Sequence, residues 1–250
     1  MVLRREGDAV LAIGQPSHAW LSGQLARAWG NERFGPLEPR EEVCLAAEQH
    51  DAGMAAWDAA PALNPATGLP YSFVEMPVET HVGLWSRAWE VVLPQSRYAA
   101  LLVSMHGTAL YAMRDLSKLG EREAGLVRAY LAGQREVQER LRASLDDASA
   151  VDRNQRLIWT WDAFSLALCL DWAPHTLRAV PAAGGAAVDV ELTPAGERAV
   201  RVDPWPFDAA ERLRVRTEGR RLDGPFDDQG DLHAALRDAP WVTLDFELVA

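Results

Sequence analysis

The chain has 250 residues, of which 48% are hydrophobic and 24% charged, and its formal net charge is −11. This composition excludes a disordered or collagen-like chain, and no apolar run approaches the roughly 18 residues that a transmembrane helix needs. Residues 1–8 are too charged for a signal peptide, so we expect a cytoplasmic protein. The acidic surface should repel nucleic acid and anionic membranes, but a bound metal could still attract a small anionic substrate into one pocket.

Strands are expected at both ends of the chain, with helices between them. Residues 2–5 and 9–13 flank a turn centred on Gly7 and predict a β-hairpin. Helical patterns then cover residues 16–29, 40–58, 76–92, 96–115, 118–147 and 151–172. After Pro174 the apolar residues alternate, which predicts strands that join the hairpin in one sheet packed on the helices.

These patterns predict a mainly α fold with two parts. Residues 1–175 would form an all-α bundle with the N-terminal hairpin, and residues 176–250 a β-rich extension packed on it. Two cysteines, Cys44 and Cys169, are too few for a disulfide framework and lie in apolar helical segments. Nothing in the sequence predicts the oligomeric state.

Four histidines fall in four different predicted helices: His18, His50, His81 and His106. A metal centre inside a helical bundle takes its ligands from facing helices, because each helix fixes the direction of its side chains. Asp51 directly follows His50, and consecutive positions lie about 100° apart on a helix, so both side chains can reach one centre. The two oxygens of Asp51 could also bridge two ions.

A further carboxylate, Asp162, lies in the most apolar helical segment of the chain, between Trp161 and Phe164. An unpaired carboxylate is costly to bury, so Asp162 should have a strong partner. Together with the histidines and Asp51 it predicts a metal site. A donor set rich in histidine favours a transition metal such as iron, manganese, zinc or nickel over magnesium.

The ligand order resembles that of the His-Asp (HD) superfamily of metal-dependent phosphohydrolases, over residues 16–172. Residues 17–26, 49–53 and 102–107 look more narrowly like an uncharacterised bacterial family within that superfamily. The resemblance implies an HD-domain-like helical bundle. It also implies one metal ion held by His18, His50, Asp51 and Asp162, and in dinuclear members a second ion held by Asp51, His81 and His106.

The resemblance further implies a hydrolase that uses metal-activated water on a small phosphorylated, anionic substrate, with Asp51 as the catalytic bridge between two divalent transition-metal ions. The chain departs from the superfamily at Met54, where many members have lysine, and at Gly107, where some have a second histidine. The same ligand order also resembles the mixed-valent diiron oxygenases of this fold. A third alternative is a non-catalytic HD-fold protein that keeps the metal for binding or regulation.

Residues that could bind the substrate are less clearly marked. Arg87, Arg114 and Lys118 follow the later histidines, and long cationic side chains bind phosphate well, although most such residues are solvated surface charges. His175 and His233 lie outside the helical ligand series, so we expect both at the surface.

Overall fold

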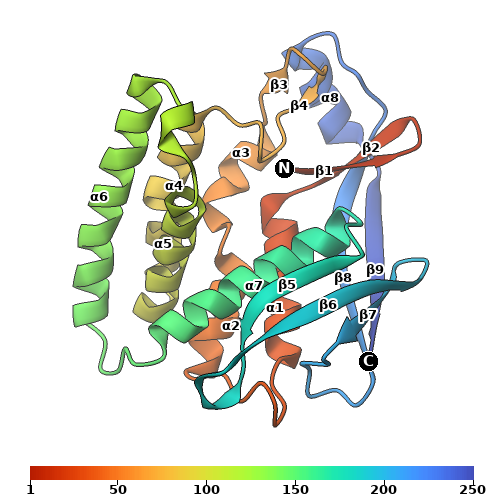
Figure 1. The fold of residues 1–250 in the computed structure, drawn as a ribbon. Helices are drawn as coiled ribbons and strands as arrows, with labels where there is room; N and C mark the ends of the chain where they lie inside the picture. The colour runs from red at the N-terminus through yellow and green to blue at the C-terminus, as the bar shows by residue number, and fades with distance from the viewer.

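The computed structural model describes residues 1–250 and contains one large curled sheet against a set of helices (Figure 1). Its strands are, in spatial order, β1 (Val2–Glu6), β2 (Ala9–Ile13), β8 (Arg212–Leu222), β9 (Trp241–Val249), β7 (Ala199–Asp203), β6 (Ala187–Gly196) and β5 (His175–Pro181). Neighbouring strands are antiparallel except β7 and β9, which are parallel. No helix has both the length and the apolar character needed to cross a membrane.

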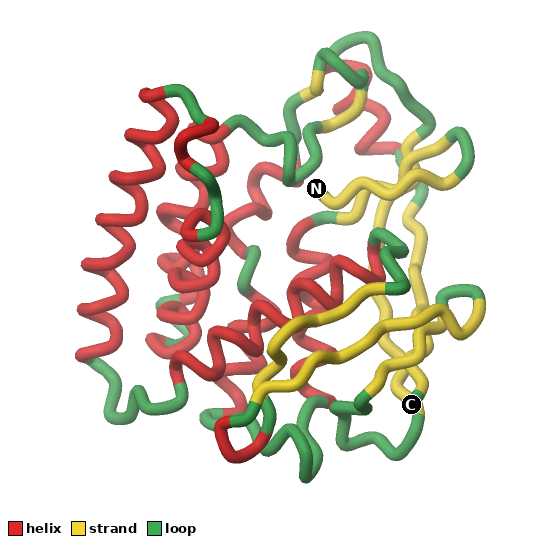
Figure 2. The backbone as a smooth tube through the Cα atoms, viewed as in Figure 1, coloured by secondary structure: helices red, strands yellow, loops and turns green.

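The helices are α1 (Gln15–Ala28), α2 (Arg40–Gln49), α3 (Ala55–Ala59), α4 (Val78–Val92), α5 (Arg97–Ala112), α6 (Glu121–Ala143), α7 (Val151–Cys169) and α8 (Gln229–Asp238). Those from α1 to α7 form layers on one side of this sheet (Figure 2), and α8 packs on the opposite face, against Ala12 and Leu222. α1 packs on β8 and α7 on β5, so this pair lies between the sheet and the outer helices α2, α4, α5 and α6. A small ribbon of β3 (Leu63–Asn64) and β4 (Leu69–Pro70) lies near α8.

The expectation of a mainly α protein, with an all-α bundle as its body, is wrong. Strands make up 23% of the chain and helices 48%, and the seven-stranded sheet forms a whole layer of an α+β fold. The sequence pattern underestimates the extent of the sheet. In β8, for example, buried Val215 and Thr217 alternate with exposed arginines, so the apolar content of this strand is low. The prediction that the N-terminal hairpin joins the C-terminal strands in one sheet is confirmed by the pairing of β2 with β8.

Side-chain hydrogen bonds fix α1 on this sheet. Gln24 bonds both the carbonyl and the amide of Arg216, as a neighbouring strand would. The buried hydroxyl of Thr217 donates to the carbonyl of Ser17 at 2.7 Å. The sheet therefore positions the N-terminal half of α1, which carries His18.

The helix predicted over residues 40–58 is interrupted. α2 ends at Gln49, and His50 and Asp51 connect it to a short 3-10 helix, η1 (Ala52–Met54). The break lets η1 pack closely on α4, where a Cβ on Gly53 would lie only 2.7 Å from the Cβ of Ala88. His50 and Asp51 thus project from the end of a helix and not from its middle.

One helix within the C-terminal region was not predicted. Asp228 caps α8 by accepting a hydrogen bond from the amide of Asp231, and Leu232 and Leu236 are its buried residues. An N-cap aspartate followed by leucines four apart is a helix signal that the strand pattern around it concealed.

Candidate metal site and substrate pocket

Five of the six predicted ligands converge in the interior, from four separate elements. His18 comes from α1, His50 and Asp51 from the end of α2, His106 from α5 and Asp162 from α7. Their exposed fractions lie between 0% and 8%. Two overlapping groups have ligand atoms within 4.8 Å of one another: His18, His50 and Asp162, and His50, Asp51 and His106.

The ring of His18 lies between a hydroxyl and a carboxylate. Its Nδ1 is 2.9 Å from the Oγ of Ser165, whose own hydroxyl donates to the carbonyl of Asp162. Nε2 of His18 lies 2.6 Å from Oδ2 of Asp51, and an N–H at this position donates to the carboxylate. A metal ion bound by both groups would take the place of that proton.

His50 is held in a similar way. Its Nδ1 donates to the carbonyl of Ala47 at 2.8 Å, so Nε2 carries the lone pair. That nitrogen is buried without a hydrogen-bond partner, 3.7 Å from Asp51 and 3.5 Å from Asp162. Burial alone would lower the pKa of His50, but the two carboxylates outweigh it and raise the pKa to about 9. In the metal-free protein this nitrogen therefore holds a proton where a metal ion would also fit.

His106 completes the cluster with a different charge state. Its Nε2 lies 3.7 Å from Asp162, and its Nδ1 is buried without a partner. Burial and the nearby charge of His50 lower the pKa of His106 to about 4, so the ring is neutral at pH 7. The pKa values of Asp51 and Asp162 are lowered despite burial, because the histidines stabilise the two carboxylates. At neutral pH the metal-free cluster therefore contains two negative charges, on Asp51 and Asp162, and one positive charge, on His50.

His81, the sixth predicted ligand, lies apart from this group on α4. Its Nε2 accepts a hydrogen bond from the indole of Trp85 at 3.1 Å, and its Nδ1 lies 2.5 Å from the hydroxyl of Tyr111. An indole nitrogen only donates, so the single proton of neutral His81 is on Nδ1 and is donated to Tyr111. Both ring nitrogens are thus occupied by protein groups.

This arrangement predicts a measurable pH dependence of stability. Burial lowers the pKa of His81 from 6.5 to about 4. Between these values the unfolded chain binds a proton that the folded protein does not, so the free energy of unfolding falls as the pH falls from 6.5 to 4. In metal-free protein, His81→Phe should reduce the loss of stability between pH 7 and pH 4.5 by about 2 kcal/mol. Urea unfolding at the two pH values measures this; equal losses in both proteins would contradict it.

The cluster forms part of the wall of a pocket of about 360 Å³. His18, Asp51, His106 and Asp162 line it together with His81, and apolar side chains form much of the remaining wall. Arg114 is the single cationic residue among the lining residues, and it has no ion-pair partner. A small molecule in this pocket would contact the His/Asp cluster and Arg114 together.

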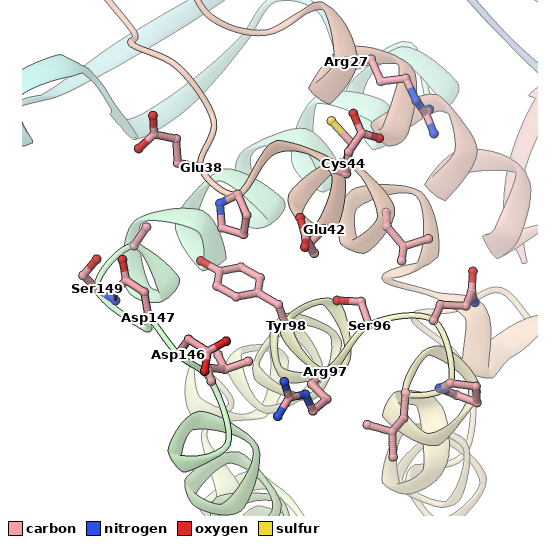
Figure 3. Close-up of a pocket in the computed structure, with 18 residues that line it drawn as sticks. Arg27, Glu38, Glu42, Cys44, Ser96, Arg97, Tyr98, Asp146, Asp147 and Ser149 are labelled. Atoms are coloured by element: carbon pink, nitrogen blue, oxygen red, sulfur yellow. Dashed lines mark hydrogen bonds between the residues drawn. The ribbon is translucent and has the colours of Figure 1, made fainter.

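A larger cavity, of about 1010 Å³, lies elsewhere, between the N-terminal ends of α2 and α5 and the loop before α7 (Figure 3). None of its lining residues belongs to the His/Asp cluster. It contains two arginines and five carboxylates: Glu38, Glu41, Glu42, Asp146 and Asp147. Cys44 lies in its wall, but burial raises the pKa of that thiol, so it stays protonated and weakly nucleophilic. This cavity is a poor place for an anion.

The sequence did not single out three residues that the structure places at the site. Ser165 orients His18, Tyr111 contacts His81, and the buried Gln15 lines the pocket with an Oε1 that has no partner. Ser165 lies one helical turn after Asp162, which was the one available signal. The hydroxyl of Tyr111 and the amide of Gln15 are recognisable only once the helices are packed.

Comparison with known proteins identifies a family but no function. No curated protein matches the chain, and no solved structure matches it. Residues 1–224 match the model of a family described as "Protein of unknown function (DUF3891)", a match that spans all the ligand-bearing helices and six of the seven strands of the sheet. The chain therefore belongs to the DUF3891 family.

Proposed function

We propose that the protein is a metal-dependent hydrolase of a small phosphorylated substrate, with one divalent transition-metal ion held by the convergent His and Asp side chains. One observation carries this proposal. Nε2 of His50 is fully buried, has no hydrogen-bond partner and faces two carboxylates at 3.5 and 3.7 Å. A histidine whose Nδ1 is fixed by a backbone carbonyl and whose Nε2 is free is the usual arrangement of a metal ligand.

The charge of the cluster also fits a divalent cation. Asp51 and Asp162 are buried as carboxylates, and in the metal-free protein the proton on His50 compensates only one of their two charges. Three imidazoles beside them favour iron, manganese, zinc or nickel over magnesium. We propose one ion instead of the two that the HD resemblance implies, because His81 would have to give up its hydrogen bond with Trp85 or with Tyr111 to hold a second.

The residues of the chain divide the chemistry between them. A bound divalent ion would activate water and neutralise charge on the phosphoryl oxygens. Ser165 and the carbonyl of Ala47 keep His18 and His50 in the orientation that presents Nε2. His106 is neutral at pH 7, so it can present a lone pair to the ion. Hydrolysis breaks the bond from phosphorus to the alcohol oxygen; water supplies the new oxygen, and the alcohol leaves with a proton.

The departure from the HD pattern at Gly107 has a structural reason. A Cβ at this position would lie 2.5 Å from the indole of Trp85 and from the hydroxyl of Tyr130. No second histidine fits beside His106, because the two aromatic side chains fill that space. The proposed site therefore differs in shape from that of HD proteins with a second histidine, although its ligand residues resemble theirs.

Metal content and activity measured on the same preparation test this proposal. The protein is purified without chelator or metal-affinity resin, and its metals are determined by elemental analysis and electron paramagnetic resonance. We expect about one equivalent of manganese, zinc, nickel or iron per chain, and phosphate release from monoesters. Two irons with a mixed-valent signal and oxygen consumption would instead indicate an oxygenase. No metal after reconstitution would refute the proposal.

Removal of the metal should also lower stability. An ion that binds only the folded state at about 1,000 times its Kd stabilises it by about 4 kcal/mol, which corresponds to roughly 10 °C in a chain of this length. We expect dialysis against chelator to lower Tm by about this amount and re-addition of the metal to restore it. Differential scanning fluorimetry measures the shift. An unchanged Tm after complete removal would contradict a structural link between the ion and the four elements that bear its ligands.

A further inference from the structure

We propose that Arg114 and Tyr111 bind the anionic group of the substrate, and that the substrate is a phosphate monoester of a compact apolar alcohol. This inference rests on the proposed function and specifies its substrate class. Arg114 and Tyr111 line the same pocket as the His/Asp cluster. Arg114 comes three residues after Tyr111, at the end of α5, and its guanidinium lies 5.8 Å from the centre of the Tyr111 ring.

Arg114 is available to a ligand. It makes no ion pair although the net charge of the chain is −11, and it differs from other arginines without an ion pair, such as Arg135 and Arg140, because it lines the pocket that the His/Asp cluster also lines. An unpaired guanidinium beside a pocket attracts anions and binds phosphate oxygens through two N–H groups. It is the only positive charge of the chain that lines this pocket.

The proton of the Tyr111 hydroxyl is also available. The oxygen already accepts the Nδ1 proton of His81, and that proton is fixed because the indole of Trp85 occupies the other ring nitrogen. No protein acceptor takes the hydroxyl proton of Tyr111, although its side chain is 2% exposed. His81 is therefore a positioning residue: it holds Tyr111 as a donor toward the pocket.

The other walls indicate what the anionic group is attached to. Besides Trp85 and Tyr111, six apolar side chains line the pocket: Phe73, Val74, Met76, Leu110, Met113 and Leu166. Val74 and Met113 are each 69% exposed, which leaves apolar surface at the pocket unless a ligand covers it. A volume of about 360 Å³ is near the lower end for small-molecule sites, so the apolar group is compact. A monoester is favoured over a diester, because its second negative charge can face Arg114 while the first faces the metal site.

Phenylphosphonate tests this inference, because its carbon–phosphorus bond is not hydrolysed and its binding can be measured without turnover. Metal-loaded protein is titrated calorimetrically at pH 8 with phenylphosphonate, its monoethyl ester, methylphosphonate and benzoate. We expect phenylphosphonate to bind at least about tenfold more tightly than each of the other three. Equal affinity for the monoethyl ester would overturn the monoester assignment, and equal affinity for methylphosphonate would overturn the apolar group.

Matched variants assign the residues. Arg114→Gln should weaken phenylphosphonate binding at least about tenfold and Tyr111→Phe about three- to tenfold. Arg87→Gln removes the same charge from an exposed arginine outside the pocket and should change nothing. His81→Leu should weaken phenylphosphonate binding as much as Tyr111→Phe does, and combining the two substitutions should not weaken it further. His81→Gln should retain an N–H donor to Tyr111 and therefore restore part of the affinity.

The result also separates this inference from the proposed function, because the metal content of every sample is measured. The anion site would be refuted if Arg114→Gln and Arg87→Gln bound phenylphosphonate equally well, or if the metal-loaded wild type did not bind it. In either case the metal site would still stand. A protein that holds no metal would refute the proposed function itself, whatever its affinity for phenylphosphonate.

Discussion

Replacing Asp162 by asparagine should remove both the metal and the activity. The carboxylate lies 3.5 Å from His50 and 3.7 Å from His106, and it supplies one of the two negative charges of the cluster. The amide has the same shape but no charge, so the variant should fold while its metal content falls below about a tenth of an equivalent and phosphate release falls at least about 1,000-fold. Elemental analysis and a monoester assay measure the two effects.

Asp152 offers a matched control on the same helix. Its exposed side chain pairs with Arg142, and Asp152→Asn makes the same chemical change far from the pocket. We expect this variant to keep its metal and activity, because surface ion pairs contribute little. Asp51→Asn should behave like Asp162→Asn, since Asp51 lies 2.6 Å from His18. If Asp162→Asn retained full metal and activity, the site as described would not exist.

Gly53→Ala should destabilise the protein and weaken metal binding together. A Cβ on Gly53 would lie 2.7 Å from the Cβ of Ala88 and 3.1 Å from the carbonyl oxygen of Leu84, both in α4. Backbone and a buried alanine cannot rotate away, so η1 must move and take Asp51, two residues earlier, with it. We expect a loss of about 2–3 kcal/mol in the free energy of unfolding and at least about tenfold weaker metal binding.

Gly83→Ala is the control for this change. Gly83 lies in α4 itself, and a Cβ there would meet no atom within 4 Å. Because alanine favours a helix over glycine, this variant should gain about 0.5–1 kcal/mol without any change in metal affinity. Urea unfolding and metal titration of the two alanine variants give the comparison. Equal stability of the two would show that η1 and α4 are not tightly packed.

The sequence by itself identified the residue types of the candidate site. Buried carboxylates and histidines on separate apolar helices need partners, and this cost is visible from periodicity and composition alone. The structure brings His18, His50, Asp51, His106 and Asp162 together. The hairpin and the single sheet shared by both ends of the chain were also predictable, because alternation of apolar residues is a local pattern.

Tertiary structure decided the rest, because it depends on contacts between segments distant in the chain. The order of the strands in the sheet and the parallel pairing of β7 with β9 are encoded by no local pattern. The break after Gln49 follows from the packing of η1 on α4. His81 has the same local signal as the other histidines, yet Trp85 and Tyr111 occupy both its nitrogens. Whether a histidine binds an ion or orients a neighbour is decided by the groups that face its two nitrogens, and only the folded chain brings these together.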